Sequence, residues 1–218
     1  SLNMTPSLEL ESIAVRLRGA PLFAPVSLTV GPGAADTLMG PSGSGKSTLL
    51  AYVSGALPGD FGGAGRVRVC GRDVTDAPPE KRRVGILFQD DLLFPHLSVG
   101  DNLAFGLAPG GDRADRRARV EAALAEADLE GFHDRDPATL SGGQRARAAL
   151  MRALLAEPEA LLLDEPFSKL DAELRDRFRR FVFEHARRRD LPTLLVTHDA
   201  ADAEAAGGRI IRLETRTA

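Results

Sequence analysis

The segment "GPSGSGKS", Gly40–Ser47, constrains the fold more than any other part of this sequence. It matches the pattern G-x-x-x-x-G-K-[ST] and stands between an apolar strand, "DTLM", and a predicted helix that runs from Lys46 to about Ser54. In this setting the backbone amides of a glycine loop converge on phosphate oxygens, and the helix dipole adds positive potential. The chain is therefore expected to fold around a strand–loop–helix unit that binds phosphate groups.

Two side chains of this loop have separate predicted roles. Lys46 would reach the β- and γ-phosphates of a nucleotide, and the hydroxyl of Ser47 would bind Mg²⁺. A glycine turn without a ligand is the alternative, and the order strand, loop, helix disfavours it. The predicted phosphate-binding residues are Gly40, Pro41, Ser42, Gly43, Ser44, Gly45, Lys46, Ser47 and Thr48.

A pair of acids follows the apolar run "LLL" near the end of the chain. Asp164 and Glu165 would lie at the carboxyl end of a buried strand, where parallel α/β sheets bind their ligands. We expect Asp164 to hold Mg²⁺ through water, and Glu165 to orient or deprotonate the attacking water. Solvated acids at an ordinary strand end are the alternative.

Two further polar residues end apolar strands. His198 follows "LLVT", and it would contact a terminal phosphate or position Glu165. Gln89 follows "VGILF", and it would sense Mg²⁺ or the attacking water. From spacing alone, each could instead be a packing or surface residue. The candidate catalytic residues are thus Glu165, His198 and Gln89, and the candidate Mg²⁺ ligands are Ser47, Gln89 and Asp164.

The other segments alternate between strand and helix patterns at both ends of the chain. Leu8–Val15 and Val26–Val30 alternate apolar and polar residues, and "RVRVCGRDV" predicts a hairpin after a loop, "LPGDFGGAG". Toward the end, "ALLLDE", "PTLLVTH" and "RIIRLE" are strands, the first two typical of parallel sheets. The helix between those two has one apolar face, formed by Leu174, Phe178, Phe181, Val182 and His185.

A mostly helical block from about Ser98 to Ala156 interrupts this alternation, after a buried strand, "VGILFQ". The pattern predicts one α/β domain with a helical insertion. We expect that domain over residues 4–218, with its core at 4–90 and 157–218, an antiparallel β subdomain near 5–35 and 65–75, and a helical subdomain at about 91–156.

Composition excludes several classes of protein. The net charge of −3 gives no nucleic-acid-binding coat, and basic tracts are interleaved with acids. Cys70 is the one cysteine, so no disulfide can form within the chain, as fits a reducing compartment. No apolar run approaches the ~18–20 residues that span a bilayer, so a membrane role would come through a partner.

Six elements, in order along nearly the whole chain, resemble the ATP-binding subunits of ABC transporters. "LSGGQ" lies about twenty residues before "LLLDE", a spacing that is nearly diagnostic of the family. The six are the phosphate loop Gly40–Thr48, Gln89 in "FQ", "LSGGQ" at Leu140–Gln144, the "LLLDEP" strand, Asp171 in "SKLD" and His198 in "VTHD".

This resemblance implies a fold, an activity and partners. The fold would be a P-loop NTPase core with a mostly parallel sheet, a small antiparallel β subdomain and a helical insertion. The activity would be ATP hydrolysis with Mg²⁺, at sites completed by a second, head-to-tail copy of the chain. The signature residues Ser141, Gly142, Gly143 and Gln144 would close on the partner copy's ATP, and Asp171 would lie at the interface.

Details of the resemblance favour an importer of the short, thiamine type, without a C-terminal regulatory domain. The chain would then work at the cytoplasmic face of the plasma membrane, bound to permease subunits and served by a solute-binding protein, with no nucleic acid involved. Leu92, Leu93 and Phe94 would line the groove for a permease helix, or fill the insertion's own core. An exporter subunit, a soluble ABC ATPase and a non-catalytic nucleotide-binding regulator are the alternative functions.

The sequence departs from the family pattern at two places. Leu17 stands where the family usually has an aromatic residue that stacks on adenine, and Phe23 is nearby but out of register. A missing ring would cost about 0.5–1.5 kcal/mol of nucleotide contact. Lys169 replaces a small or amide residue in "SKLD".

Overall fold

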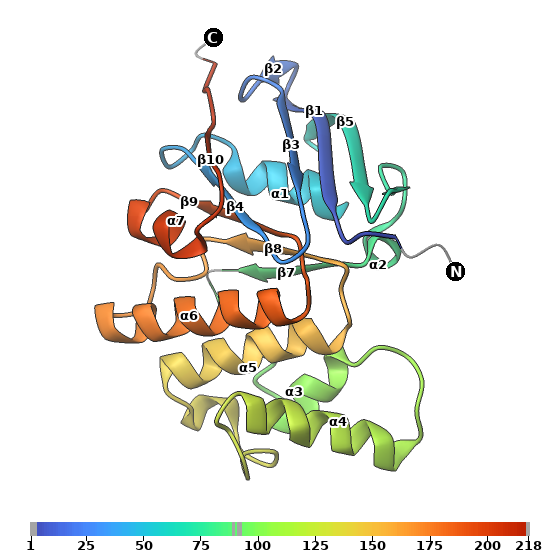
Figure 1. Ribbon diagram of the computed structural model, residues 1–218, viewed down its shortest axis with the longest axis vertical. Helices are drawn as coiled ribbons and strands as arrows, with labels where there is room; N and C mark the ends of the chain where they lie inside the picture. Colours follow the sequence, from blue (N-terminus) through green and yellow to red (C-terminus); the bar gives the residue numbers. More distant parts are fainter. Residues whose placement is uncertain (1–3, 89, 91–92, 217–218) are drawn as a thin grey trace. The chain divides into compact units, whose positions relative to one another are not determined.

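The computed structural model describes residues 4–88, 90 and 93–216, and these form two compact units (Figure 1). The first unit contains the described residues up to Ile86, together with Glu159–Glu165 and the residues from Arg179 onward. The second unit contains the described residues of Leu87–Pro158 and Pro166–Phe178. This differs from the expected boundaries, because Pro166–Phe178 clusters with the helices and not with the core. Its two ends pack together there, with the rings of Phe167 and Phe178 5.7 Å apart.

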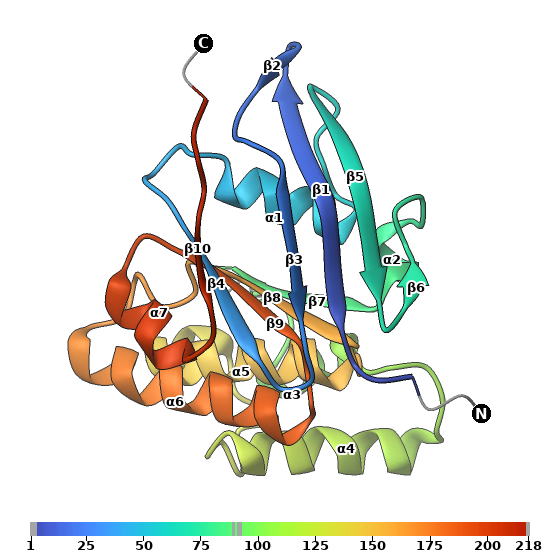
Figure 2. The ribbon, with the colours of Figure 1, turned by 45° about the horizontal axis from the view of Figure 1, so that its top comes forward.

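The first unit contains most of a five-stranded sheet that carries the phosphate loop, since only the last two residues of β7 group with the second unit. The strand order is β10-β4-β9-β8-β7, and the described pairings β10–β4, β4–β9 and β9–β8 are all parallel. The carboxyl ends of the three central strands therefore meet at one edge (Figure 2). The strands are β4 (Ala35–Met39), β7 (Val84–Phe88), β8 (Ala160–Asp164), β9 (Thr193–Thr197) and β10 (Ile210–Arg212).

Strand β7 is less buried than the sequence predicts. Leu87 is its buried residue, and Phe88 is 46% exposed. The reason is its place at the end of the sheet order, where a strand has a neighbour on one side only.

A second, antiparallel sheet also belongs to the first unit. Its path is β2-β1-β5-β6, and β3 pairs with β1 (Figure 2). This confirms the small antiparallel sheet and the predicted hairpin. The strands are β1 (Leu8–Leu17), β2 (Ala20–Pro21), β3 (Val26–Val30), β5 (Phe61–Val69) and β6 (Arg72–Asp73).

The predicted loop "LPGDFGGAG" is wrong in its second half, because β5 begins at Phe61. Glycine is a poor strand former, but here Tyr52 of the neighbouring helix lies across the strand. A Cβ at Gly63 would stand 2.3 Å from the Tyr52 ring, and the Tyr52 hydroxyl donates to the Gly65 carbonyl at 2.7 Å. Packing between elements therefore overrides the local propensity of this segment.

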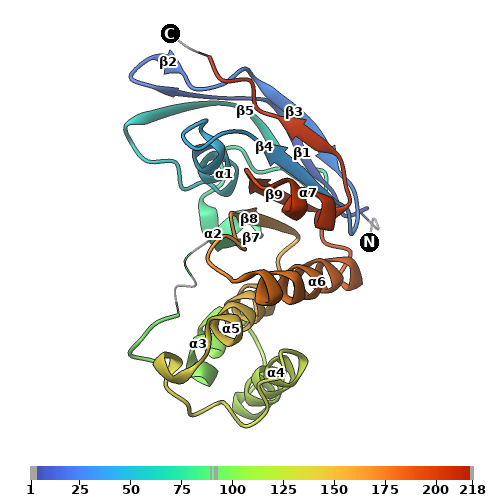
Figure 3. The same ribbon diagram turned by 90° about the vertical axis from the view of Figure 1, so that its left-hand side faces the viewer.

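Helix α1 (Lys46–Ser54) lies between the two sheets of the first unit (Figure 3). The core there combines residues of both sheets with Leu49, Leu50 and Val53 of α1. At the C-terminal end of α1 the buried Arg82 donates to the carbonyls of Tyr52 and Val53 at 3.1 and 3.0 Å. The other helices of the unit are α2 (Pro79–Arg82), the C-terminal part of α6 (Ala172–Arg188) and α7 (Ala200–Ala206).

The second unit consists mostly of helices. Leu93 is buried in it, and the Phe94 ring lies edge-on to Phe105 at 4.9 Å, with the Arg152 guanidinium 5.0 Å from the Phe94 ring. The burial of Leu93 favours a role in packing over one in an exposed groove, whereas Leu92 lies outside the described residues. The helices are α3 (Val99–Gly106), α4 (Arg113–Glu126), the 3₁₀ helix η1 (Pro137–Thr139) and α5 (Gly142–Leu155). Within the part of the chain that the structure describes, no helix has the length and apolarity to cross a bilayer.

Candidate functional site

The phosphate loop follows β4 and leads directly into α1. Gly43 and Gly45 have φ angles of 82° and 92°, in the left-handed region that glycine adopts without strain. A Cβ at Gly45 would also lie 2.9 Å from the Phe23 ring. A Cβ at Gly40 would lie 2.7 Å from the hydroxyl oxygen of the buried Ser44. The loop can close this tightly because its glycines have no side chains.

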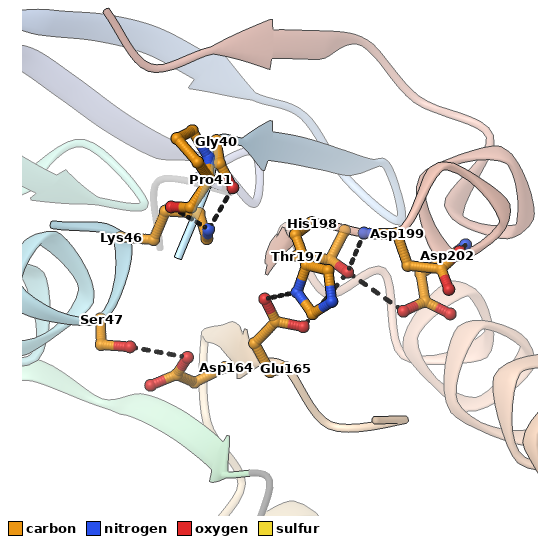
Figure 4. Close-up of polar contacts among 10 residues, drawn as sticks. All are labelled: Gly40, Pro41, Lys46, Ser47, Asp164, Glu165, Thr197, His198, Asp199 and Asp202. Carbon is orange, nitrogen blue, oxygen red and sulfur yellow. Dashed lines mark hydrogen bonds and ion pairs between the residues drawn. The ribbon is translucent and has the colours of Figure 1, made fainter. Parts of the chain in front are cut away.

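Lys46 lies folded over this loop (Figure 4). Its ammonium donates to the carbonyl oxygen of Gly40 and, at 3.0 Å, to that of Pro41. Burial lowers the pKa of Lys46 below its usual value, and the carboxylates of Glu165 and Asp164 oppose this change by favouring the charged form. The sheet thus places one cation of the loop in the field of both acids.

Ser47 and Asp164, both proposed from the sequence as Mg²⁺ ligands, lie within hydrogen-bonding distance of each other. The Ser47 hydroxyl donates to Asp164 Oδ1 at 3.1 Å, although 117 residues separate the two in sequence (Figure 4). Burial raises the pKa of Asp164, while the Ser47 hydrogen bond opposes the rise. The two oxygens form a small hard-donor site at the carboxyl end of β8.

Glu165 and His198 also come together. His198 Nδ1 lies 2.8 Å from Glu165 Oε1 (Figure 4). Glu165 has a φ of 46°, which is strained for a residue with a side chain, and its amide donates to the Val196 carbonyl at 3.0 Å. The backbone hydrogen bond fixes the start of the Glu165 loop to β9, the strand that His198 follows.

A cavity of about 380 Å³ in the first unit is lined by three of these groups, Lys46, Ser47 and Glu165. The carbonyl oxygens of Gly40 and Pro41 accept hydrogen bonds from Lys46. Ser44, also a residue of the loop, is buried. The cavity is lined by phosphate-loop residues, by Glu165 and by two apolar residues. The lining residues are Leu22, Ser42, Gly43, Gly45, Lys46, Ser47, Thr48, Phe61 and Glu165.

Leu22 and Phe61 are the two lining residues that the sequence analysis missed, and Phe61 is the aromatic one. It is the cross-strand partner of Leu17 in the β1–β5 pairing, so the two side chains share one face of the sheet. Phe23 is 1% exposed and belongs to the core. An aromatic ring is therefore present beside the phosphate loop, one strand away from the position where the family pattern places it. The signal in the sequence was weak, because Phe61 stands in a glycine-rich segment predicted as a loop.

The signature segment lies in the second unit, at the start of α5. Ser141 is the exposed N-cap: its hydroxyl accepts from the Gln144 amide at 3.2 Å, and the Gln144 side chain accepts from the Ser141 amide at 2.9 Å. This capping box fixes the first turn of the helix. A Cβ at Gly143 would meet Leu174 at 3.1 Å, so the helix approaches its neighbour closely there.

Asp171 and Lys169 both make contacts within the second unit. Asp171 is exposed and accepts from the Leu174 amide at 3.0 Å. Lys169 forms an exposed ion pair with Asp90. Gln89 lies outside the described residues, so its predicted role stays a prediction.

The parallel sheet, the phosphate loop and the acids beside it define an ATPase of the phosphate-loop class. A model of the ABC transporter family matches residues 23–168, which is well over half of the chain. The chain therefore belongs to the ABC transporter ATP-binding family. This confirms the resemblance, the fold and the ATPase activity predicted from the six motifs.

Three relatives illustrate the match. The chain is 49% identical over 195 residues to the uncharacterized ABC transporter ATP-binding protein YnjD of Escherichia coli (strain K12), covering 89% of this chain and 90% of YnjD. It is 45% identical over 210 residues to the thiamine import ATP-binding protein ThiQ of Jannaschia sp. (strain CCS1), covering 95% and 89%. It is 44% identical over 185 residues to the sulfate/thiosulfate import ATP-binding protein CysA 2 of Chromobacterium violaceum, covering 85% of this chain but 50% of CysA 2.

Proposed function

We propose that this chain hydrolyses ATP to power solute import through a membrane ABC transporter. The observation that carries the hydrolytic part is the pairing of Glu165 with His198 at 2.8 Å, because Glu165 lines the same cavity as Lys46 and Ser47. Relatives that are named for thiamine import and for sulfate/thiosulfate import support the direction of transport.

In this proposal the phosphate loop binds the triphosphate. The ammonium of Lys46 would exchange its carbonyl acceptors, Gly40 and Pro41, for oxygens of the β- and γ-phosphates. The left-handed Gly43 and Gly45 turn the backbone so that loop amides and the N-terminus of α1 face the same anion. These contacts are the reason to expect tight binding of the triphosphate end.

The residues present also fit Mg²⁺. Ser47 and Asp164 offer a hydroxyl and a carboxylate 3.1 Å apart, and Mg²⁺ is typically held by one or two such oxygens together with substrate phosphates and water. Among the described residues, no cluster of three or more His, Cys, Asp or Glu could hold a metal, so phosphate oxygens would complete the site. The ion would neutralise charge on the phosphates, and Gln89 is the further ligand we propose.

Glu165 is the residue we assign to the attacking water. Its carboxylate would hold or accept the water proton, and His198 would keep that carboxylate in place while facing the terminal phosphate. His198 can serve both because one of its ring nitrogens lies 2.8 Å from Glu165 and the side chain is 56% exposed.

The apolar end of the cavity would receive the base. Leu22 and Phe61 line the cavity together with the phosphate loop, and they are its apolar side chains. If the nucleotide extends from the phosphate loop toward these apolar residues, its base would contact Phe61, which lines the cavity, and not Leu17. We therefore propose that Phe61 supplies the ring that the family pattern places at the Leu17 position.

Replacing Phe61 by alanine is expected to weaken ATP binding about threefold to tenfold, because one aromatic stacking contact is lost. Binding of inorganic tripolyphosphate should stay unchanged, since it has no base. Leu17→Ala, at the cross-strand neighbour, is the matched control and should bind ATP as the wild type does. Calorimetric titration of the three proteins measures this. Equal ATP affinity in Phe61→Ala would remove Phe61 from the base site.

We also propose that two head-to-tail copies complete each other's sites. The cavity lining comes from the first unit, whereas the signature helix starts at an exposed residue of the second unit. Ser141 keeps a hydroxyl proton to donate while its oxygen caps α5, and the amides of Gly142 and Gly143 are first-turn donors. A partner copy's γ-phosphate suits these donors, with Gln144 holding the turn and Asp171 at the interface.

Permease subunits and a solute-binding protein are the remaining proposed partners. They would place the chain at the cytoplasmic face of the plasma membrane and would select the solute. An exporter subunit is the second candidate function, but the named relatives favour import.

A reconstituted complex tests the import proposal. The chain is combined in proteoliposomes with the permease subunits and solute-binding protein encoded beside its gene. We expect ATP turnover to rise severalfold when the solute-bound binding protein is added. Solute should accumulate on the side of the membrane opposite to the binding protein. Solute movement toward the binding-protein side would instead indicate an exporter.

A further inference from the structure

Behind the Glu165–His198 pair lies a polar network to which no role has been given above. Thr197, the last residue of β9, is fully buried, and its hydroxyl oxygen lies 3.1 Å from Asp202 Oδ2 and 3.4 Å from Glu165 Oε2. The amide of Asp199 donates to the same oxygen at 3.0 Å (Figure 4). One hydroxyl group thus connects two carboxylates.

Asp202 is itself fixed by an ion pair. It is 0% exposed, on the first turn of α7, and Arg179 Nε of α6 donates to its Oδ1 at 2.6 Å. The Arg179 side chain is 11% exposed, so the pair is shielded from water. A buried carboxylate held by a guanidinium has little freedom to turn, and removing one partner of such a pair is costly.

A hydroxyl has a single proton, and this decides how Thr197 is oriented. The Asp199 amide occupies one of its lone pairs, and the proton goes to one of the two carboxylates. The shorter contact, 3.1 Å to Asp202, exceeds the usual upper limit for O–H···O bonds by only about 0.1 Å, whereas the contact with Glu165 is longer, at 3.4 Å. Asp202 therefore holds the hydroxyl in place, and the same hydroxyl group makes the longer, polar contact with the Glu165 carboxylate.

We infer that Thr197, Asp202 and Arg179 are positioning residues for the hydrolytic pair. The Thr197 hydroxyl contacts Glu165, and Thr197 directly precedes His198 in the chain. A change in the conformation of Thr197 would therefore displace both Glu165 and His198. The inference rests on the proposed role of Glu165 in hydrolysis. None of the three positioning residues lines the cavity or needs to touch the nucleotide.

Thr197→Val tests this inference, because valine keeps the shape of threonine and removes the hydroxyl. We expect kcat to fall about tenfold while the KM for ATP stays within about twofold, since a misplaced base affects the reaction and not the binding of substrate. Thr197→Ser restores the hydroxyl and should recover most of the rate.

Thr193→Val is the matched control. Thr193 begins the same strand, is equally buried, and donates its hydroxyl to the Leu191 carbonyl at 3.1 Å. It should lose thermal stability like Thr197→Val without losing kcat. If Thr197→Val does not fold, Thr197→Ala is compared with Thr193→Ala in the same way.

A double-mutant cycle tests whether Asp202 acts through Thr197. Asp202→Asn should lower kcat about threefold or more in the wild-type background and scarcely at all in the Thr197→Val background, since residues of one network are not additive. Independent, multiplying effects would overturn the link from Asp202.

Glu165→Gln, measured in parallel, distinguishes a failure of the positioning inference from a failure of the proposed role of Glu165. If Glu165→Gln loses turnover while Thr197→Val keeps the wild-type kcat, the positioning inference is wrong and the proposed function stands. If Glu165→Gln itself keeps the wild-type rate, the proposed function of Glu165 is wrong.

Discussion

Glu165→Gln is expected to bind ATP normally and to lose turnover by about 10²–10³-fold, because a glutamine amide cannot accept a proton from water. The side chain keeps its size, and an oxygen or nitrogen remains opposite His198, which now lies 2.8 Å from Glu165. The loss of one negative charge also removes a contribution that raises the pKa of Lys46. Because Asp164 still contributes in the same direction, the loop cation should remain able to bind the triphosphate.

The Glu165→Gln measurement has two parts. Steady-state phosphate release gives the rate, and titration with ATP in the presence of Mg²⁺ gives the affinity. Light scattering should also show an ATP-dependent dimer that persists, since the γ-phosphate joining the copies is not removed. Glu204→Gln, an exposed glutamate of α7, is the control and should behave as the wild type. Wild-type turnover in Glu165→Gln would require another base.

Ser141→Arg is expected to abolish hydrolysis while leaving the affinity for ATP within about twofold, because in the proposed dimer the affected surface would serve the partner copy's nucleotide and not its own. Ser141 is exposed at the start of α5, so the arginine can be accommodated in the single chain. It would stand where the terminal phosphate of the partner's ATP must approach.

The loss of a helix cap has to be separated from this steric effect. Ser141→Arg also removes a capping hydroxyl, at a cost of about 1 kcal/mol. Asp112→Arg removes the exposed cap of α4, whose carboxylate accepts from the Asp115 amide at 2.9 Å, and should lower stability without lowering turnover. Wild-type hydrolysis by Ser141→Arg would contradict the proposal of a site completed in trans.

Mixing the two inactive variants gives a sharper test of the same proposal. In a dimer of one Glu165→Gln copy and one Ser141→Arg copy, one site carries both defects and the other carries neither. Activity should therefore reappear on mixing, whereas each variant alone stays inactive. If Ser141 and Glu165 acted within one chain, mixing would restore nothing.

Glu165 and His198 show how much of the candidate site could be predicted from the sequence. Glu165 and His198 were each placed at the end of an apolar strand, and the structure brings them to 2.8 Å. The sequence alone left two contacts open for His198, one with a phosphate and one with Glu165. Neither strand's sequence shows that β8 and β9 are neighbours in the sheet. The third neighbour, Thr197, gave no signal, since a threonine at a strand end is ordinary.

The base end of the cavity was harder to predict. Phe61 stands among glycines, and local propensity there favours a loop. Tyr52 of α1 and the pairing with β1 decide that this segment is a strand, and the register then places Phe61 opposite Leu17.

The sequence by itself determined the phosphate loop, the acids after β8, the capped signature helix and the family. Each of these is a contiguous segment whose backbone conformation follows from its own glycines, caps and apolar runs. Only the tertiary structure decided the contacts of Thr197 with Asp202, the place of Phe61 and the grouping of Pro166–Phe178 with the helices. Those depend on strand register and on packing between segments far apart in the chain, which no local pattern encodes.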